Sequence, residues 1–184
     1  MDQKVAGGNE LLNPEAVLKE AGVGFGQRVA DLGCGGMAYF TLQAGKIVGS
    51  KGRVYAVDIL KSVLENVKTR VKLEGLDNVK AVWSNVEILG ATKIKEASLD
   101  FALLINTLFQ SKKHKEMISE AWRLLKKGGR LVIVDWRSIA TPFGPALDDR
   151  VTEAEIEQIA QELGIKKEKT FEAGPYHYGF VFLK

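Results

Sequence analysis

The stretch VADLGCGGMAYF, residues 29–40, ends an apolar run with a carboxylate and continues through glycines. Glycine has no Cβ, so a glycine-rich turn lets the backbone approach a bound ligand closely. A helix that begins after such a turn presents unpaired N–H groups, which favour a negatively charged ligand group. The stretch is therefore typical of a loop that binds a nucleotide-like ligand.

Two interpretations of this loop fit its spacing. The pattern G-x-G-x-x-G/A matches Gly33, Gly35 and Ala38 and indicates a dinucleotide site, in which the helix faces a pyrophosphate. The pattern D-x-G-x-G matches Asp31 and the same two glycines, and the helix would then face an amino-acid carboxylate. In either case Asp58, at the end of the next apolar run, can accept hydrogen bonds from ribose hydroxyls.

Three features favour the second interpretation. Asp31 would repel a pyrophosphate but attract a ligand that bears an ammonium group. A dehydrogenase normally needs further sheet or a substrate domain, for which 184 residues leave little room. The closing sequence TFEAGPYHYGFVFLK does not belong to a plain doubly wound pattern. A nicotinamide-dependent oxidoreductase stays as the less favoured alternative.

Composition narrows the class of protein. Hydrophobic residues make up 46% and charged residues 27%, which is typical of a soluble globular fold. The net charge of +3 is too small to indicate nucleic-acid binding, which usually involves a clustered basic face, so we expect no nucleic-acid partner. A single cysteine forbids an internal disulfide and favours a reducing, cytoplasmic compartment. The start MDQKVAGGNE lacks the apolar core of a signal peptide, and no apolar run of about 18 residues predicts a membrane span.

Hydrophobic periodicity predicts strands that alternate with helices. The expected strands cover 28–32, 53–57, 79–83, 99–105 and 130–135, and the expected helices cover 13–20, 37–48, 60–74 and 113–125. Gly128 and Gly129 indicate a stop for the last of these helices. A helix over 152–163, with a capping box of Thr152 and Glu155, and two antiparallel strands over 165–171 and 177–183 complete the chain. The loop 137–150 is expected to be the most mobile segment.

Polar residues follow the predicted strands. They are Asp31, Asp58, Asn85, Asn106 and Asp135. Ligands of parallel sheets bind at the carboxyl ends of the strands, so this edge is the predicted site.

Together these motifs resemble class I S-adenosylmethionine-dependent methyltransferases. VADLGCGGMAYF is similar to the family's glycine motif, VYAVDI to its ribose motif, and LDFALLINTLF to its fourth-strand motif. LLKKGGRLVIVDW resembles the approach to the fifth strand, and PYHYGFVF the closing strand. The pattern is most similar to ubiquinone/menaquinone-type C-methyltransferases and arsenite methyltransferases.

The resemblance implies one domain over 1–184, with an N-terminal helical segment, 1–24, packed on its core. It implies a Rossmann-like α/β fold: a seven-stranded, mostly parallel sheet with an antiparallel last strand and helices on both faces. It implies direct methyl transfer from S-adenosyl-L-methionine to a small molecule. The residues implied at the cofactor are Asp31, Gly33, Cys34, Gly35, Asp58, Ile59, Asn85, Val86 and Asn106.

One residue departs from the family pattern. Met37 stands where relatives usually have a third glycine, and it would narrow the cofactor pocket. This departure favours an alternative function, a non-catalytic module that binds S-adenosylmethionine or has a regulatory role.

Asp135, His177 and Asn106 are the candidate catalytic residues. Asp135 and His177 are the candidate bases, needed only if the nucleophile must lose a proton, and Asn106 would border the transferred methyl group. Trp136, Arg137 and Tyr176 are expected nearby. Two histidines and one cysteine are too few for a zinc site, and one cysteine argues against an arsenic substrate. The sequence does not identify the acceptor or the oligomeric state.

Overall fold

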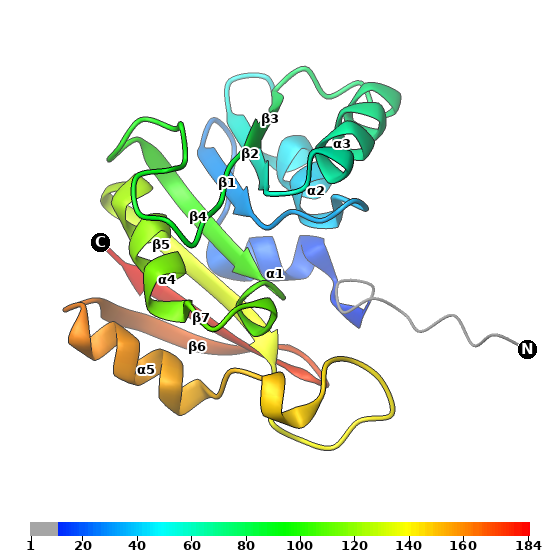
Figure 1. The fold of residues 1–184 in the computed structure, drawn as a ribbon. Coiled ribbons are helices and arrows are strands. Elements are labelled where there is room, and N and C mark those ends of the chain that lie inside the picture. Colours follow the sequence, from blue (N-terminus) through cyan, green and yellow to red (C-terminus); the bar gives the residue numbers. More distant parts are fainter. Residues whose placement is uncertain (1–10) are drawn as a thin grey trace, which may run out of the picture.

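Seven strands form one sheet in the order β3-β2-β1-β4-β5-β7-β6 (Figure 1). The computed structural model describes residues 11–184. The strands are β1 (Arg28–Leu32), β2 (Arg53–Asp58), β3 (Val79–Trp83), β4 (Leu99–Ile105), β5 (Leu125–Trp136), β6 (Lys166–Gly174) and β7 (His177–Leu183). The α-helices are α1 (Pro14–Ala21), α2 (Tyr39–Val48), α3 (Lys61–Leu73), α4 (His114–Leu124) and α5 (Glu153–Glu162), and two short 3₁₀ turns are η2 (Leu108–Gln110) and η3 (Leu147–Asp149).

Strands β1 to β5 pair in parallel, whereas β7 runs antiparallel to both of its neighbours, β5 and β6. Two residues connect β6 to β7, too few for the crossover that a parallel pair requires. The predicted Rossmann-like sheet, mostly parallel with an antiparallel last strand, is therefore confirmed.

Helices cover both faces of the sheet (Figure 1). On one face α1 and α2 bury Leu18 and Phe40 against valines of the sheet, and α3 packs beside α2. On the other face α4 and α5 bury Met117 and Ile156 against alternate residues of the same strands. Because side chains alternate along a strand, each strand supplies both layers, and the sheet is buried on both sides.

Two helix starts agree with their sequence signals. Asn13 Oδ1 accepts a hydrogen bond from Ala16 N at 3.0 Å, Pro14 begins α1, and Gly22 ends it in the left-handed conformation. Thr152 Oγ1 accepts from Glu155 N at 3.1 Å at the start of α5. Part of the predicted N-terminal segment, residues 1–10, lies outside the described residues.

Three local expectations differ from the structure. α2 begins at Tyr39, because Ala38 adopts a left-handed conformation with φ of 53°. Gly128 and Gly129 do not end a helix: α4 ends at Leu124, and both glycines lie in an irregular part of β5. The Glu155 carboxylate does not complete a capping box but contacts His114 Nδ1 at 2.6 Å.

Glu120 of α4 fixes the loop that connects β3 to β4. Its fully buried carboxylate accepts hydrogen bonds from Gly90 N at 2.7 Å and Thr92 N at 2.9 Å, and from Arg123 at 2.8 Å to each oxygen. Burial alone would raise the pKa of Glu120, but the hydrogen bonds from Arg123, Gly90 and Thr92 outweigh it and lower the pKa to about 2. The carboxylate therefore stabilises the fold as an anion.

We predict that Glu120→Gln lowers the free energy of unfolding by about 3 kcal/mol, because it leaves Arg123 and two amides imperfectly paired. Glu116→Gln, an exposed position of the same helix, is the matched control. Since the folded pKa is below the ordinary 4.5, the deficit is complete above pH 4.5 and shrinks as the pH falls towards about 2. Urea unfolding at several pH values measures it, and a deficit equal to that of the control would contradict this role.

Candidate active site

A pocket of about 270 Å³ lies at the carboxyl ends of the parallel strands. Its walls come from the β1–α2 loop, the end of β2 with the start of α3, the segment after β3, and the segment between β4 and α4. The lining residues are Gly33, Gly35, Asp58, Ile59, Leu60, Val63, Ser84, Asn85, Val86, Glu87, Thr107, Gln110, Ser111 and Met117. We call this the donor pocket.

The glycine loop is held against β2 and β4. Gly33 N and Cys34 N donate to Val57 O at 2.8 and 3.0 Å, so the loop follows the end of β2. Gly33 has a φ of 82°, and a Cβ there would lie 2.4 Å from Thr107 Cγ2. The close approach of β1 to the end of β4 therefore requires glycine at this position.

Asp58 also lines the donor pocket, next to the glycine loop. Its Oδ2 accepts from Gly35 N at 3.2 Å, and its Oδ1 accepts from Leu60 N at 2.9 Å. A carboxylate oxygen can accept two hydrogen bonds, so these contacts orient the group and leave it able to accept from hydroxyls. This arrangement suits a diol such as that of a ribose.

Asp31 does not line the donor pocket. It is 3% exposed, and its Oδ2 accepts from Thr41 Oγ1 at 2.6 Å. Burial raises the pKa of Asp31 to about 6, with the Thr41 hydrogen bond acting against the rise and the charge of Asp58 adding to it. A cation bound beside this carboxylate would favour its ionised form.

Of the other residues expected at the cofactor, three line the donor pocket and two do not. Ile59, Asn85 and Val86 line the donor pocket. Cys34 is buried in the cluster between α2 and α3, where burial raises the pKa of its thiol. Asn106 is also buried, with φ of 52°, and its N–H donates to Val134 O at 2.8 Å across to β5.

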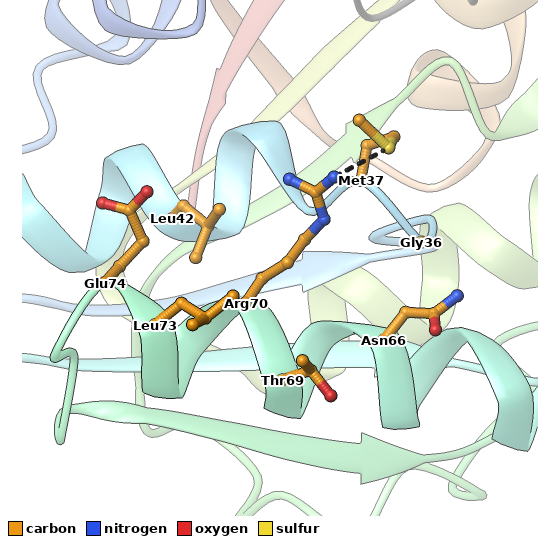
Figure 2. Close-up of a pocket in the computed structure, with 8 residues that line it drawn as sticks. All are labelled: Gly36, Met37, Leu42, Asn66, Thr69, Arg70, Leu73 and Glu74. Carbon is orange, nitrogen blue, oxygen red and sulfur yellow. Dashed lines mark hydrogen bonds between the residues drawn. The ribbon is translucent and has the colours of Figure 1, made fainter.

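Met37 lies in a different groove. Its side chain is 44% exposed and is among the residues of a groove of about 590 Å³ between the glycine loop and α3. Figure 2 shows Arg70 reaching from α3 to Met37, and its Nη2 lies 3.2 Å from Met37 Sδ. The expectation that Met37 narrows the donor pocket is therefore wrong, because the side chain leaves the loop towards α3 and is not among the lining residues.

The two candidate bases point to opposite faces of the sheet. Asp135 pairs with Tyr178, whose side chain joins the cluster under α4 and α5, whereas His177 pairs with Trp136 on the α1 and α2 face. Burial raises the pKa of Asp135 to about 6, against the effect of the Trp136 amide that donates to it. Burial, followed by the charge of Arg150, lowers the pKa of His177 to about 4. The two groups cannot act together on one small acceptor.

The sequence did not single out several lining residues: Ser84, Glu87, Thr107, Gln110, Ser111 and Met117. Most of them follow the polar residues Asn85 and Asn106 by a few positions, and this proximity was the available signal. Within residues 11–184 no group of three or more His, Cys, Asp or Glu side chains is arranged to hold a metal ion. None of the helices in that range is long and apolar enough to cross a membrane.

A family model described as "Methyltransferase domain" matches residues 25–174. The chain therefore belongs to the methyltransferase-domain family, as its resemblance to class I enzymes predicted.

Among curated relatives, the ubiquinone/menaquinone biosynthesis C-methyltransferase of Vibrio vulnificus is 30% identical over 150 residues, which are 80% of this chain and 56% of the relative. The corresponding protein of a Marinomonas species is 28% identical over 137 residues, or 74% of this chain and 53% of the relative. The chain thus spans about half the length of the curated relatives it matches.

Solved structures agree with the fold. A SAM-dependent methyltransferase from Aquifex aeolicus superposes with a TM-score of 0.86 at 29% identity, covering 95% of this chain and 90% of that one. An arsenic(III) S-adenosylmethionine methyltransferase from Chlamydomonas reinhardtii superposes with a TM-score of 0.69 at 23% identity, covering 86% and 63%.

We predict that Gly33→Ala weakens binding of S-adenosylhomocysteine at least about tenfold and lowers stability by about 1–3 kcal/mol. The added methyl group would fall 2.4 Å from Thr107 Cγ2. Thr107→Ser in the same chain removes that methyl group and should restore part of both losses. Isothermal titration and urea unfolding of the single and double variants measure the coupling, and strictly additive effects would contradict the contact.

We predict that Asp58→Ala weakens S-adenosylhomocysteine binding about 10- to 100-fold, because a charged hydrogen-bond acceptor is lost. The far-UV spectrum should be unchanged. Asp77→Ala, an exposed carboxylate outside the pocket, is the control. Equal affinities for Asp58→Ala and the native chain would refute the ribose assignment.

Proposed function

We propose that this chain is a methyltransferase domain that transfers a methyl group from S-adenosyl-L-methionine to a small-molecule acceptor. The observation that supports this most strongly is the donor pocket, in which the glycine loop faces Asp58. Family membership and the likeness to the Aquifex structure support the same function.

The residues of the donor pocket fit the parts of this cofactor. Asp58 would hold the ribose hydroxyls, Ile59 and Val86 would flank the adenine, and Asn85 would hydrogen-bond its edge. Gly33 and Gly35 would line the methionine portion, and a Cβ built at Gly35 would have no atom within 4 Å. Cys34 contributes its backbone to the same loop.

Asp31 is buried outside the donor pocket, so it would act on the cofactor through its charge and not through direct contact. A ligand ammonium near the loop would favour the ionised carboxylate, which Thr41 already orients at 2.6 Å. The proposed role of Asp31 is therefore electrostatic.

When bound, S-adenosylmethionine supplies an electrophilic methyl group on a sulfonium sulfur, which retains the electron pair of the broken bond. The protein aligns the acceptor with that bond and excludes water. Such alignment can contribute roughly 7–11 kcal/mol. Asn106 lies where β4 meets β5, beside the donor pocket, and would border the transferred methyl.

Asp135 and His177 keep different proposed roles. Asp135, with a pKa raised to about 6, can take a proton near neutral pH, but its side chain lies on the α4 and α5 face. His177, with a pKa of about 4, is neutral at pH 7 and is suited to hydrogen-bond an acceptor rather than to hold a proton.

The argument for a non-catalytic module came from Met37, and the position of this residue outside the donor pocket removes that argument.

We further propose a cytoplasmic location, because the chain has a single cysteine, and no nucleic-acid partner, because its net charge is low. We interpret residues 1–184 as a single domain.

Isothermal titration with S-adenosylhomocysteine tests the cofactor. We predict binding in the micromolar range at pH 7.5, and weaker binding as the pH falls through about 6, where Asp31 takes up a proton. NADH is the control ligand and should not bind. A folded sample that gives no heat with S-adenosylhomocysteine, or that binds NADH instead, would overturn the proposed function.

A further inference from the structure

Two walls of the donor pocket are joined by a single side-chain hydrogen bond. Ser111 Oγ donates to Glu87 Oε1 at 2.7 Å, and both residues are among those that line the pocket. Glu87 belongs to the segment after β3, whereas Ser111 lies between β4 and α4. The bond therefore connects parts of the wall that are 24 residues apart in the chain, and we call it the latch.

Ser111 is the fixed end of the latch. Its Oγ accepts a hydrogen bond from Lys113 N at 2.9 Å, and its carbonyl oxygen accepts one from His114 Nε2 at 2.7 Å. The other ring nitrogen of His114 contacts Glu155 Oε1 at 2.6 Å, which connects this wall to α5. Because His114 is buried, solvent competes little for these bonds. The position of Ser111 is therefore set by contacts with α4 and α5.

Residues 85–89, which we call the flap, lie between two fixed ends. Before the flap, Ser84 is buried, and its hydroxyl lies 3.1 Å from that of Thr92. After the flap, Gly90 N and Thr92 N donate to the buried carboxylate of Glu120 at 2.7 and 2.9 Å. The two ends of the flap thus meet at a fixed base, about which the residues between them can pivot.

The flap itself is compact but loosely packed. Glu87 N donates to Asn85 Oδ1 at 2.9 Å, and Ile88 N donates to Asn85 O at 3.3 Å, so these residues can move as one turn. Of its three apolar side chains, Val86 packs against the core, whereas Ile88 and Leu89 are 54% and 61% exposed. Segments with few buried apolar contacts open at the lowest cost in free energy.

The latch is weak compared with the contacts at the base of the flap. The Glu87 side chain is 31% exposed, and its second contact is an ion pair with the exposed Lys113 at 3.5 Å. Glu120 is fully buried and accepts four hydrogen bonds. One partly exposed hydrogen bond changes an equilibrium by only about two- to tenfold. The base therefore stays in place under conditions in which the latch opens and closes.

The size of the donor pocket gives this motion a purpose. With the latch closed, the volume of the pocket is about 270 Å³. Pockets that enclose small molecules usually measure roughly 300–1,000 Å³. A ligand as large as S-adenosylmethionine therefore requires part of the wall to move before it can enter or leave.

We propose that the flap is a lid of the donor pocket, and that the latch between Glu87 and Ser111 controls entry and release of the cofactor. As a statement about the cofactor, this inference rests on the proposed function. Asn85 and Val86 lie on the flap and line the pocket, so opening the latch withdraws both from the ligand. Glu87 and Ser111 are therefore positioning residues, which act through the flap.

Stopped-flow kinetics of S-adenosylhomocysteine binding to the full chain tests the latch. Ser111→Ala removes the latch, and we expect the association and dissociation rate constants both to rise about three- to tenfold. The Kd should change less than either rate constant, because the latch closes the empty and the occupied pocket alike. Trp83 is the fluorescent reporter, since its Nε1 donates to the carbonyl of the lining residue Ile59 at 2.8 Å.

Two further serine variants are the controls. Ser111→Thr keeps the hydroxyl group and should keep the native rates. Ser119→Ala removes a hydroxyl group of α4 that donates to Lys115 O outside the pocket, and it should also keep them. If Ser111→Ala raised the dissociation rate alone and the Kd by the same factor, Ser111 would be a direct ligand contact and the latch would be overturned. Unchanged rates in Ser111→Ala would overturn it as well.

Hydrogen exchange without ligand tests the latch independently of the cofactor. In Ser111→Ala the amides of residues 85–89 should exchange at least about threefold faster than in the native chain. The amides of Gly90 and Thr92, which Glu120 holds, should exchange at their native rates. If the flap exchanges faster but S-adenosylhomocysteine does not bind at all, the proposed function fails and the latch stands. Native exchange of the flap in Ser111→Ala would refute the latch.

Discussion

The backbone that leaves β1 is bound to the end of β2 by three N–H groups, and the rest of the site depends on this attachment. Gly33 N and Cys34 N donate to Val57 O, and Gly35 N donates to the Asp58 carboxylate. The same loop contacts Thr107 at the end of β4, where there is no space for a Cβ. One turn therefore sets the relative positions of β1, β2 and β4, and with them the width of the donor pocket.

The pKa values of two buried carboxylates, Glu120 and Asp31, are shifted in opposite directions because the groups have different hydrogen-bond partners. Glu120 has two backbone amides and an arginine, so its pKa falls to about 2 despite burial. Asp31 has one hydroxyl partner and a neighbouring carboxylate, and burial raises its pKa to about 6. The first carboxylate stabilises a loop as an anion, whereas the second takes up a proton as the pH falls through about 6. The number of donors around each group accounts for this difference.

Periodicity predicted the elements of the sheet because each strand is a short apolar run and each helix has one apolar face. The edge at which Asp58 and Asn85 meet followed from the parallel order alone. The opposite directions of Asp135 and His177 depend on which residue of β7 faces which residue of β5, and the sequence does not give that register. Thr107 and Met117 enter the donor pocket through the turn after β4, whose path depends on tertiary packing.

The place of β7 in the sheet also constrains the order of folding. β6 is an edge strand that pairs only with β7. β7 lies between β6 and β5 and connects β6 to the rest of the sheet. During synthesis β6 leaves the ribosome first and has no neighbour to pair with, whereas β1 to β5 can already assemble. The aromatic residues of β7 are needed to complete the layer under α5. We therefore expect nascent chains to hold a parallel half-sheet that is completed last by a hairpin.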